Sequence, residues 1–249
     1  MALTDNLISY WELEEASGTR NDSHGTNHLT DNNTVLNAAG KVGNAADFED
    51  TSSEYLSCAD NATLSVGNID FTLCAWVRLE SKPSHKMDIL GKHGGSDMEY
   101  DLRWNNLTDR FELRVCSGPS DANLQIAESL SGAPSTATFY FIVAWHDATA
   151  NTVNIQVNNG TVDSVTHTFG SYDSGASFKI GGFTDFNEYW DGLIDQVGFW
   201  KRVLTAPERT SLYNSGNGLS YAALTGGAAG WGGLLGHKAN RLVVPVVPL

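Results

Sequence analysis

The sequence predicts an all-β protein in which two antiparallel sheets pack face to face as a sandwich. Apolar and polar residues alternate over many short stretches, as they do in strands that bury one face. Clusters of Gly, Asn, Asp and Ser separate these stretches at short intervals. This spacing is typical of antiparallel strands joined by turns and does not fit a regular alternation of strands and helices.

The alternation predicts strands along most of the chain. In order, the candidate strands are LISYWEL, ADFED, EYLSCA, FTLCAWVRL, KMDILGK, EYDLRW, RFELRV, FYFIVAW, TVNIQV, SFKIGGF and GLIDQVGFW. In FTLCAWVRL, alternate residues from Phe71 to Leu79 share one face, and FYFIVAW repeats the pattern. Val153 and its alternate neighbours are expected to point inward before a turn at Asn159-Gly160, a pair preferred in type I′ hairpins.

One short helix is predicted in TAPERTSLYNSG. Thr205 is expected as its N-cap, and Glu208 three residues later completes a capping box. Gly216 is the expected C-terminal stop, because glycine adopts the left-handed conformation that ends many helices.

The charge excludes some partners. The chain of 249 residues has a net charge of −14, and residues 222–249 contain Lys238 and Arg241 but no acid, so residues 1–221 carry −16. Such an acidic body repels nucleic acid and anionic membrane surfaces, and neither is expected as a partner. Cys58, Cys74 and Cys116 form no CxxC pair and are interpreted as small buried thiols.

The composition changes after Tyr221, which divides the chain into a domain at 1–221 and a tail at 222–249. A Gly/Ala-rich stretch leads into the apolar end RLVVPVVPL. Proline suits an extended segment on a sheet edge or in a groove, so the tail is predicted to be an assembly arm that clamps a sister subunit or a shell protein. Its anchoring residues are Leu242, Val243, Val244, Val246, Val247 and Leu249. The alternative is a tail that folds back on its own domain.

Four segments carry a resemblance to a known family. They are YWELEEASGTRNDSHGTNH, ADFEDTSSEYLSCADNATLSVGNIDFTLCAWVRLE, FYFIVAWHDATANTVNIQVNNGTV and YWDGLIDQVGFWKRVLTAPERTSLYNSG. In this order, across residues 7–219, they resemble a laminin-G-like domain of the concanavalin A-like lectin/glucanase superfamily. The resemblance implies a two-sheet jelly roll. Gln196, where the family usually has Glu, and Gly198, which interrupts the last strand, depart from the pattern.

A calcium site is the first candidate for chemistry. The loop NDSHGTN offers Asp22, Thr26 and Asn27, and Ca²⁺ requires six to eight oxygens, so a second segment must contribute. Asp195 is that contribution, because it is expected on an inward face and because the resemblance implies that the two segments lie close together. The alternative is an Asx turn at Asp22 and an Asp195 that accepts backbone N–H groups.

Glycan contact is the second candidate. A sugar ring needs an exposed aromatic face with polar neighbours, which Phe186 and Tyr189 or Tyr100 and Trp104 offer. The alternative is that these aromatic residues belong to the core. Catalysis is not expected. Glycoside hydrolysis needs two carboxylates at a set separation. The nearest related run, Asp97, Glu99 and Asp101, is interpreted as a charged, solvated strand face or as an edge strand protected against pairing.

These observations favour a non-catalytic structural or decoration protein of a larger particle. The start MALTDNLISYW lacks the features of a secretory signal, which fits a virion component made in the host cytoplasm and displayed on a phage surface. Contact with host-surface glycans would then be a secondary role. The alternative is a free glycan-binding module or a degenerate glycoside hydrolase.

Overall fold

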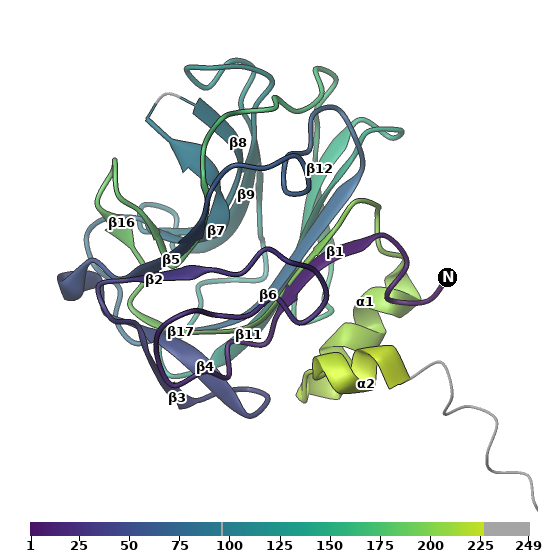
Figure 1. Ribbon diagram of the computed structural model, residues 1–249. Helices are drawn as coiled ribbons and strands as arrows, with labels where there is room; N and C mark the ends of the chain where they lie inside the picture. The colour runs from purple at the N-terminus through teal and green to yellow at the C-terminus, as the bar shows by residue number, and fades with distance from the viewer. Residues whose placement is uncertain (96, 227–249) are drawn as a thin grey trace, which may run out of the picture.

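The computed structural model describes residues 1–95 and 97–226 and confirms the predicted sandwich of two antiparallel sheets (Figure 1). The eight-stranded sheet has the order β13 (Val162–Thr166), β12 (Thr152–Val157), β11 (Phe139–Asp147), β6 (Phe71–Leu79), β17 (Gly192–Trp200), β4 (Asn44–Phe48) and β3 (Leu36–Ala39), and β1 (Leu7–Trp11) also pairs with β17. The seven-stranded sheet has the order β10 (Gln125–Glu128), β9 (Arg110–Val115), β8 (Asp97–Asn105), β7 (Met87–Gly94), β14 (Phe178–Ile180), β5 (Tyr55–Cys58) and β2 (Thr30–Asn32).

One short hairpin and four helical elements complete the described fold. The hairpin consists of β15 (Gly182–Phe183) and β16 (Glu188–Tyr189), and the helical elements are η1 (Asp50–Ser52), α1 (Ala206–Tyr213), η2 (Asn214–Gly216) and α2 (Tyr221–Gly226). Each predicted strand segment contains an observed strand, whereas the short strands β2, β3, β10 and β16 lack a clear alternation and were not predicted. No helix in the described part of the chain is long and apolar enough to cross a membrane.

The main core lies between the two sheets. The alternate residues of β6 from Phe71 to Leu79 all belong to it, as predicted, and face Tyr100, Leu102 and Trp104 from the opposite sheet. Burial of this many apolar side chains is the main source of stability in a sandwich of this kind.

A second apolar layer lies on the outer face of the eight-stranded sheet. The alternate residues of β11, such as Phe141 and Trp145, pack there with Trp76 and Trp200. Helices α1 and α2 cover this layer (Figure 1), and Leu212 of α1 and Leu224 of α2 are buried in it. The sheet therefore has two apolar faces, one against the other sheet and one against the helices.

Two turns differ from the prediction by one or two residues. The β12–β13 hairpin forms, but the residues with positive φ are Asn158 and Asn159, so the turn lies one residue earlier than Asn159-Gly160. The capping box of α1 at Thr205 and Glu208 is present. The helix ends at Asn214, which adopts the left-handed conformation, and not at Gly216. In both places asparagine takes the role expected of glycine.

The interruption of β17 is a bulge. The strand runs from Gly192 to Trp200, but its register against β6 shifts between Asp195 and Gly198, and Gln196 has a φ of 49°. A Cβ on Gly198 would lie 2.5 Å from the ring of Trp200. Glycine at this position therefore gives the Trp200 ring the space that it needs.

Candidate functional site

The outer face of the seven-stranded sheet is charged instead of apolar. Side chains of a strand alternate between its two faces, so Tyr100, Leu102 and Trp104 of β8 enter the core while Asp101 and Arg103 point outward. Strand β9 repeats the pattern next to it. Its residues Phe111, Leu113 and Val115 lie in the core, and Glu112 and Arg114 point outward.

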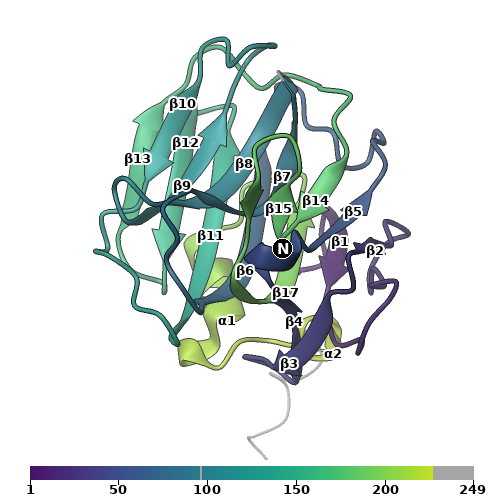
Figure 2. The same cartoon turned by 90° about the vertical axis from the view of Figure 1, so that its left-hand side faces the viewer.

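The hairpin β15–β16 covers part of this face (Figure 2). A Cβ on Gly91 of β7 would clash with the carbonyl oxygen of Tyr100 and would lie 3.2 Å from the ring of Phe183, so glycine at this position accommodates both the neighbouring strand β8 and the hairpin. Asp185 in the hairpin turn also accepts a hydrogen bond of 2.8 Å from the backbone N–H of Gly95. The charged residues beneath the hairpin are consequently buried although they belong to the outer face.

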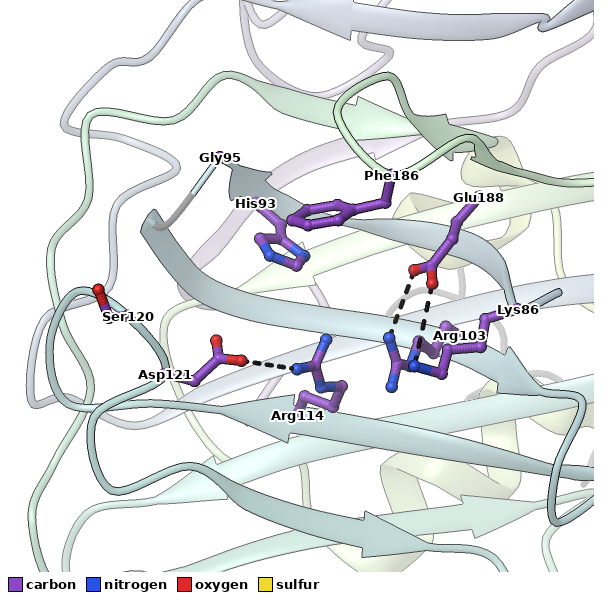
Figure 3. Close-up of a pocket in the computed structure, with 9 residues that line it drawn as sticks. All are labelled: Lys86, His93, Gly95, Arg103, Arg114, Ser120, Asp121, Phe186 and Glu188. Carbon is purple, nitrogen blue, oxygen red and sulfur yellow. Dashed lines mark hydrogen bonds and ion pairs between the residues drawn. The ribbon is translucent and has the colours of Figure 1, made fainter.

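Ion pairs hold the two arginines in place (Figure 3). Arg103 donates from Nε to Glu112 at 2.6 Å, and its Nη1 lies 3.4 Å from Glu188 of the hairpin. Arg114 donates to Asp101 at 3.1 Å and lies 3.3 Å from Asp121 in the β9–β10 loop. Charge-assisted pairs of this kind fix the direction of a guanidinium group.

A pocket of about 380 Å³ opens between the hairpin and the β9–β10 loop. Its lining residues are Lys86, His93, Gly95, Arg103, Arg114, Ser120, Asp121, Phe186 and Glu188 (Figure 3). Phe186 is 43% exposed, and its ring lies over that of His93 with 4.6 Å between centroids. Burial lowers the pKa of His93, so the neutral imidazole is favoured.

Asp88 lies under the charged face and is fully buried. Among residues 1–95 and 97–226, no N–H or O–H group donates a hydrogen bond to either of its carboxylate oxygens. Burial and then the neighbouring carboxylates of Asp101 and Glu188 raise the pKa of Asp88 well above its usual range, against the opposing effect of Arg103. Asp88 is therefore favoured in its protonated form.

Of the four residues expected to contact a glycan, the structure places one in the pocket. Phe186 lines it, whereas Tyr189, 7% exposed, packs against Tyr55 on the other side of the hairpin. Tyr100 and Trp104 are buried in the main core, so the expectation that they present a ring to a sugar is wrong. Tyr100 and Trp104 occupy alternate positions of β8 that point inward, and the charged residues between them point outward and belong to the charged face.

The run Asp97, Glu99 and Asp101 is also different from the prediction. A register shift against β7 separates Glu99 from Asp101, and Glu99 pairs with Lys92 at 2.8 Å with both side chains fully buried. Asp101 is buried with the arginines. The interpretation of this run as a solvated face is therefore wrong, because the hairpin and the surrounding loops exclude solvent from it.

The predicted calcium residues make separate networks. Asp22 accepts four backbone N–H groups, those of Tyr10, His24, Gly25 and Asn27. Asp195 is buried, and its Oδ2 accepts the N–H groups of Lys41 and Val42 at 2.7 and 2.9 Å. Burial raises the pKa of Asp195 to about 7. Asp22 therefore makes the contacts of an Asx turn, and Asp195 accepts backbone N–H groups. Both arrangements were the stated alternatives to calcium binding.

Calcium at this loop stays a prediction. In the described part of the chain, Asp22 and Asp195 share no hydrogen-bond partner. Thr26 lies in the Asp22 loop beside Asn27, and the side chain of Asn27 donates to Ser9 and Thr63. Within residues 1–95 and 97–226, one group of three acidic or metal-ligating side chains has its ligand atoms within 4.8 Å of one another, Asp47, Glu49 and Glu80. It contains none of the four predicted residues.

The start of the predicted arm belongs to the domain. Residues 222–226 continue helix α2, Leu224 is buried, and the backbone N–H of Tyr221 donates to Glu12 at 3.0 Å. The domain thus extends beyond Tyr221, to at least Gly226. Leu242, Val243, Val244, Val246, Val247 and Leu249 lie outside the described residues.

The comparisons with known proteins agree with this fold. A laminin-G-type family model, described as the concanavalin A-like lectin/glucanases superfamily, matches residues 50–208. The chain belongs to this superfamily, and it is a lectin-like jelly-roll domain. No curated protein matches its sequence.

Three solved structures illustrate the likeness. The binding domain of Paraclostridial Mosquitocidal Protein 1 has a TM-score of 0.71 at 15% identity, covering 86% of this chain and 53% of that one. Domain 4 of AbnA, a GH43 extracellular arabinanase from Geobacillus stearothermophilus, in complex with arabinotriose, has a TM-score of 0.57 at 19% identity, covering 83% and 97%. Trypanosoma rangeli sialidase has a TM-score of 0.63 at 15% identity, covering 87% and 34%. The chain thus spans about half of the toxin's binding domain, and at these identities the likeness shows the fold alone.

Proposed function

We propose that this domain binds a saccharide in the pocket beside hairpin β15–β16 and does not hydrolyse it. The observation that carries the proposal is the position of Phe186, a large aromatic ring left 43% exposed at a pocket whose other walls are polar. The apolar face of a sugar ring packs on such an aromatic surface, while sugar hydroxyls need donors and acceptors beside it.

The polar walls are suited to hydroxyl groups. Arg103 and Arg114 are each fixed by carboxylates, so their remaining N–H groups keep one direction before the ligand arrives. Glu188 and Asp121 supply acceptors from the two opposite walls. Preorganised groups of this kind reduce the entropy that binding must overcome.

The same pairing argues against hydrolysis. A glycoside hydrolase needs one protonated carboxyl and one carboxylate next to the bond that breaks. Glu188 lies 3.4 Å from Arg103 and 3.9 Å from Lys86, and Asp121 lies 3.3 Å from Arg114, so both carboxylates that line the pocket are engaged in ion pairs. Asp88, whose protonated form is favoured, is fully buried. We expect no release of reducing ends from glycans that bind, and turnover that disappears in Glu188→Gln would contradict this proposal.

Binding is tested on an array of linear oligosaccharides that includes arabinotriose, because the arabinanase domain of matching length was solved with that sugar. We expect Phe186→Ala to weaken binding about tenfold through loss of stacking and apolar contact. Phe169→Ala is the matched control, since Phe169 is 59% exposed and does not line the pocket. Wild-type protein that binds no arrayed glycan, or equal effects of the two variants, would overturn the proposal.

The assembly role on a virion or another particle remains a separate proposal, based on the apolar sequence of residues 227–249. Because α2 packs on the domain, the chain should be truncated after Gly226 and not after Tyr221. The proposal requires that this truncated protein folds but no longer oligomerises or joins its particle. Normal assembly of the truncated protein would contradict it.

Calcium binding is likewise a proposal, in which an ion would have to compete with the backbone N–H groups that now bind Asp22. It requires that EDTA lowers the melting temperature of the wild type and leaves that of Asp22→Ala unchanged. Identical melting of the wild type with calcium and with EDTA would contradict it.

A further inference from the structure

A second pocket of about 220 Å³ lies on the other side of the same hairpin. Its lining residues are Asp50, Ser53, His85, Asn187 and Tyr189. Drug-sized ligands occupy pockets of about 300 Å³ or more, so this smaller space suits a group of the size of one sugar ring.

The two pockets share their dividing wall. Phe186 and Glu188 line the first pocket, whereas Asn187 and Tyr189 line the second. Phe186 and Asn187 lie in the turn of the hairpin, and Glu188 and Tyr189 form β16, in which successive side chains point to opposite sides. The hairpin therefore presents side chains to a pocket on each of its two sides.

A second segment shows the same division. Lys86 lines the first pocket and His85 lines the second, so neighbouring residues again point to different pockets. The two segments meet where Lys86 lies 3.9 Å from Glu188. These two chain segments therefore form the wall that separates the two pockets.

The chemistry of the second pocket suits neutral hydroxyl groups. His85 and Asp50 hydrogen-bond to each other at 3.1 Å. This bond fixes the orientation of both side chains and places a carboxylate acceptor beside a ring nitrogen. Asn187 is exposed and has a φ of 54°, a left-handed conformation that asparagine tolerates better than most residues. Its amide adds two donors and one acceptor.

We propose that this second pocket is a further saccharide subsite, and that the ligand is an oligosaccharide long enough to cross the wall and occupy both pockets. The inference rests on the proposed function of the first pocket. It adds a ligand class, a neutral chain of several sugar units, and it assigns Asn187 and His85 as residues that contact the distal unit.

The test compares arrayed arabino-, xylo-, cello- and galacto-oligosaccharides of two to six units. We expect wild-type affinity to rise with chain length for the series that binds. Asn187→Gly keeps the positive φ, which glycine adopts freely, and removes the amide. It should weaken binding of the longest members about fivefold, the size of one net hydrogen bond, and leave the shortest members that bind unchanged. His85→Ala should give the same pattern.

Asn151→Gly is the matched control, because Asn151 is an exposed turn residue with a φ of 56° that lines neither pocket. Wild-type affinity that is the same at two and six units would overturn the second subsite while leaving the first intact. Equal loss at every length in Asn187→Gly would overturn it as well. Wild-type protein that binds none of these sugars would overturn the proposed function and the subsite together.

Discussion

The two sheets of this domain both have covered outer faces, but the covers differ in chemistry. On the eight-stranded sheet, helices α1 and α2 lie on an apolar layer that includes Trp76, Phe141 and Trp200. On the seven-stranded sheet, hairpin β15–β16 lies over carboxylates and arginines that are almost as deeply buried. One face is built as an additional core, and the other as a network of ion pairs.

The difference separates stability from recognition. An apolar layer gains free energy in proportion to the area removed from water. Burying ion pairs gains little, because the loss of hydration offsets most of the Coulomb attraction. Arg103 and Arg114 line the pocket and are held by the buried carboxylates of Glu112 and Asp101. We therefore propose that the buried network serves to orient these two arginines for a ligand more than to stabilise the fold.

The largest effect is expected on the apolar face. Trp76 is 2% exposed and packs on Phe141 and Tyr213 with ring centroids 5.1 and 5.8 Å away. Trp76→Ala should lower the free energy of unfolding by about 3–5 kcal/mol, as other large-to-small core substitutions do. Urea unfolding measures this change. Glycan affinity of the folded protein should stay at the wild-type value, and a specific loss of affinity would show that the two faces are not independent.

A smaller effect is expected when one member of the charged network is removed. Arg103→Met leaves Glu112 without its cation, whereas Asp101 keeps Arg114. A buried charge without a partner costs about 3 kcal/mol. Unlike Trp76→Ala, this variant should also weaken glycan binding, since Arg103 lines the pocket.

Arg110→Met on the same strand β9 as Glu112 provides the control. The side chains of Arg110 and its partner Glu128 are 30% and 29% exposed, and a pair this accessible contributes less than about 1 kcal/mol. If the two arginine variants lose the same stability, the buried network has no special cost and the contrast between the faces is unfounded.

The two sheets could be predicted from the sequence because the alternation of apolar and polar residues recurs along it. Alternation identified the inward residues of β6 and β12, since these strands bury one face against the other sheet. It was insufficient for β2, β3 and β16, whose two to four residues are too few to show a period. Helix α2 was missed because its Ala and Gly content resembles a linker, and Leu224 is its one buried side chain among the described residues.

The site was harder to predict from the sequence, because an alternation of apolar and charged residues has two interpretations. Charges at every second position of DLRW and FELRV indicate a polar face, but they do not tell whether solvent or a hairpin covers it. The hairpin at residues 182–189 is far away in sequence, and the approach of its Phe183 to Gly91 of β7 is a contact that no local pattern indicates. Opposite charges at Arg103 and Glu112 on two predicted neighbouring strands were the available sign that the face is paired and buried.

The smallest effect is expected from pH, and it should distinguish the two faces. Because the pKa of Asp88 is raised in the folded protein, the folded state keeps this proton while the unfolded chain releases it near its ordinary pKa of about 4. The unfolded chain thus binds fewer protons, and the contribution of Asp88 to stability decreases as pH rises above about 4.

Asp88→Asn removes this dependence, because the amide is neutral at every pH and similar in shape. In urea unfolding at pH 4, 6 and 8, the variant should match the wild type most closely at pH 4 and become progressively more stable than it as pH rises. Trp76→Ala is the control, because Trp76 packs in a layer of aromatic and aliphatic side chains that includes Trp200 and Leu212. This variant should lose the same free energy of unfolding at each pH. Parallel pH profiles for the wild type and Asp88→Asn would mean that the carboxyl is ionised in the folded protein. Asp88 would then need a cationic partner on the charged face, and the protonated form assigned to it would be wrong.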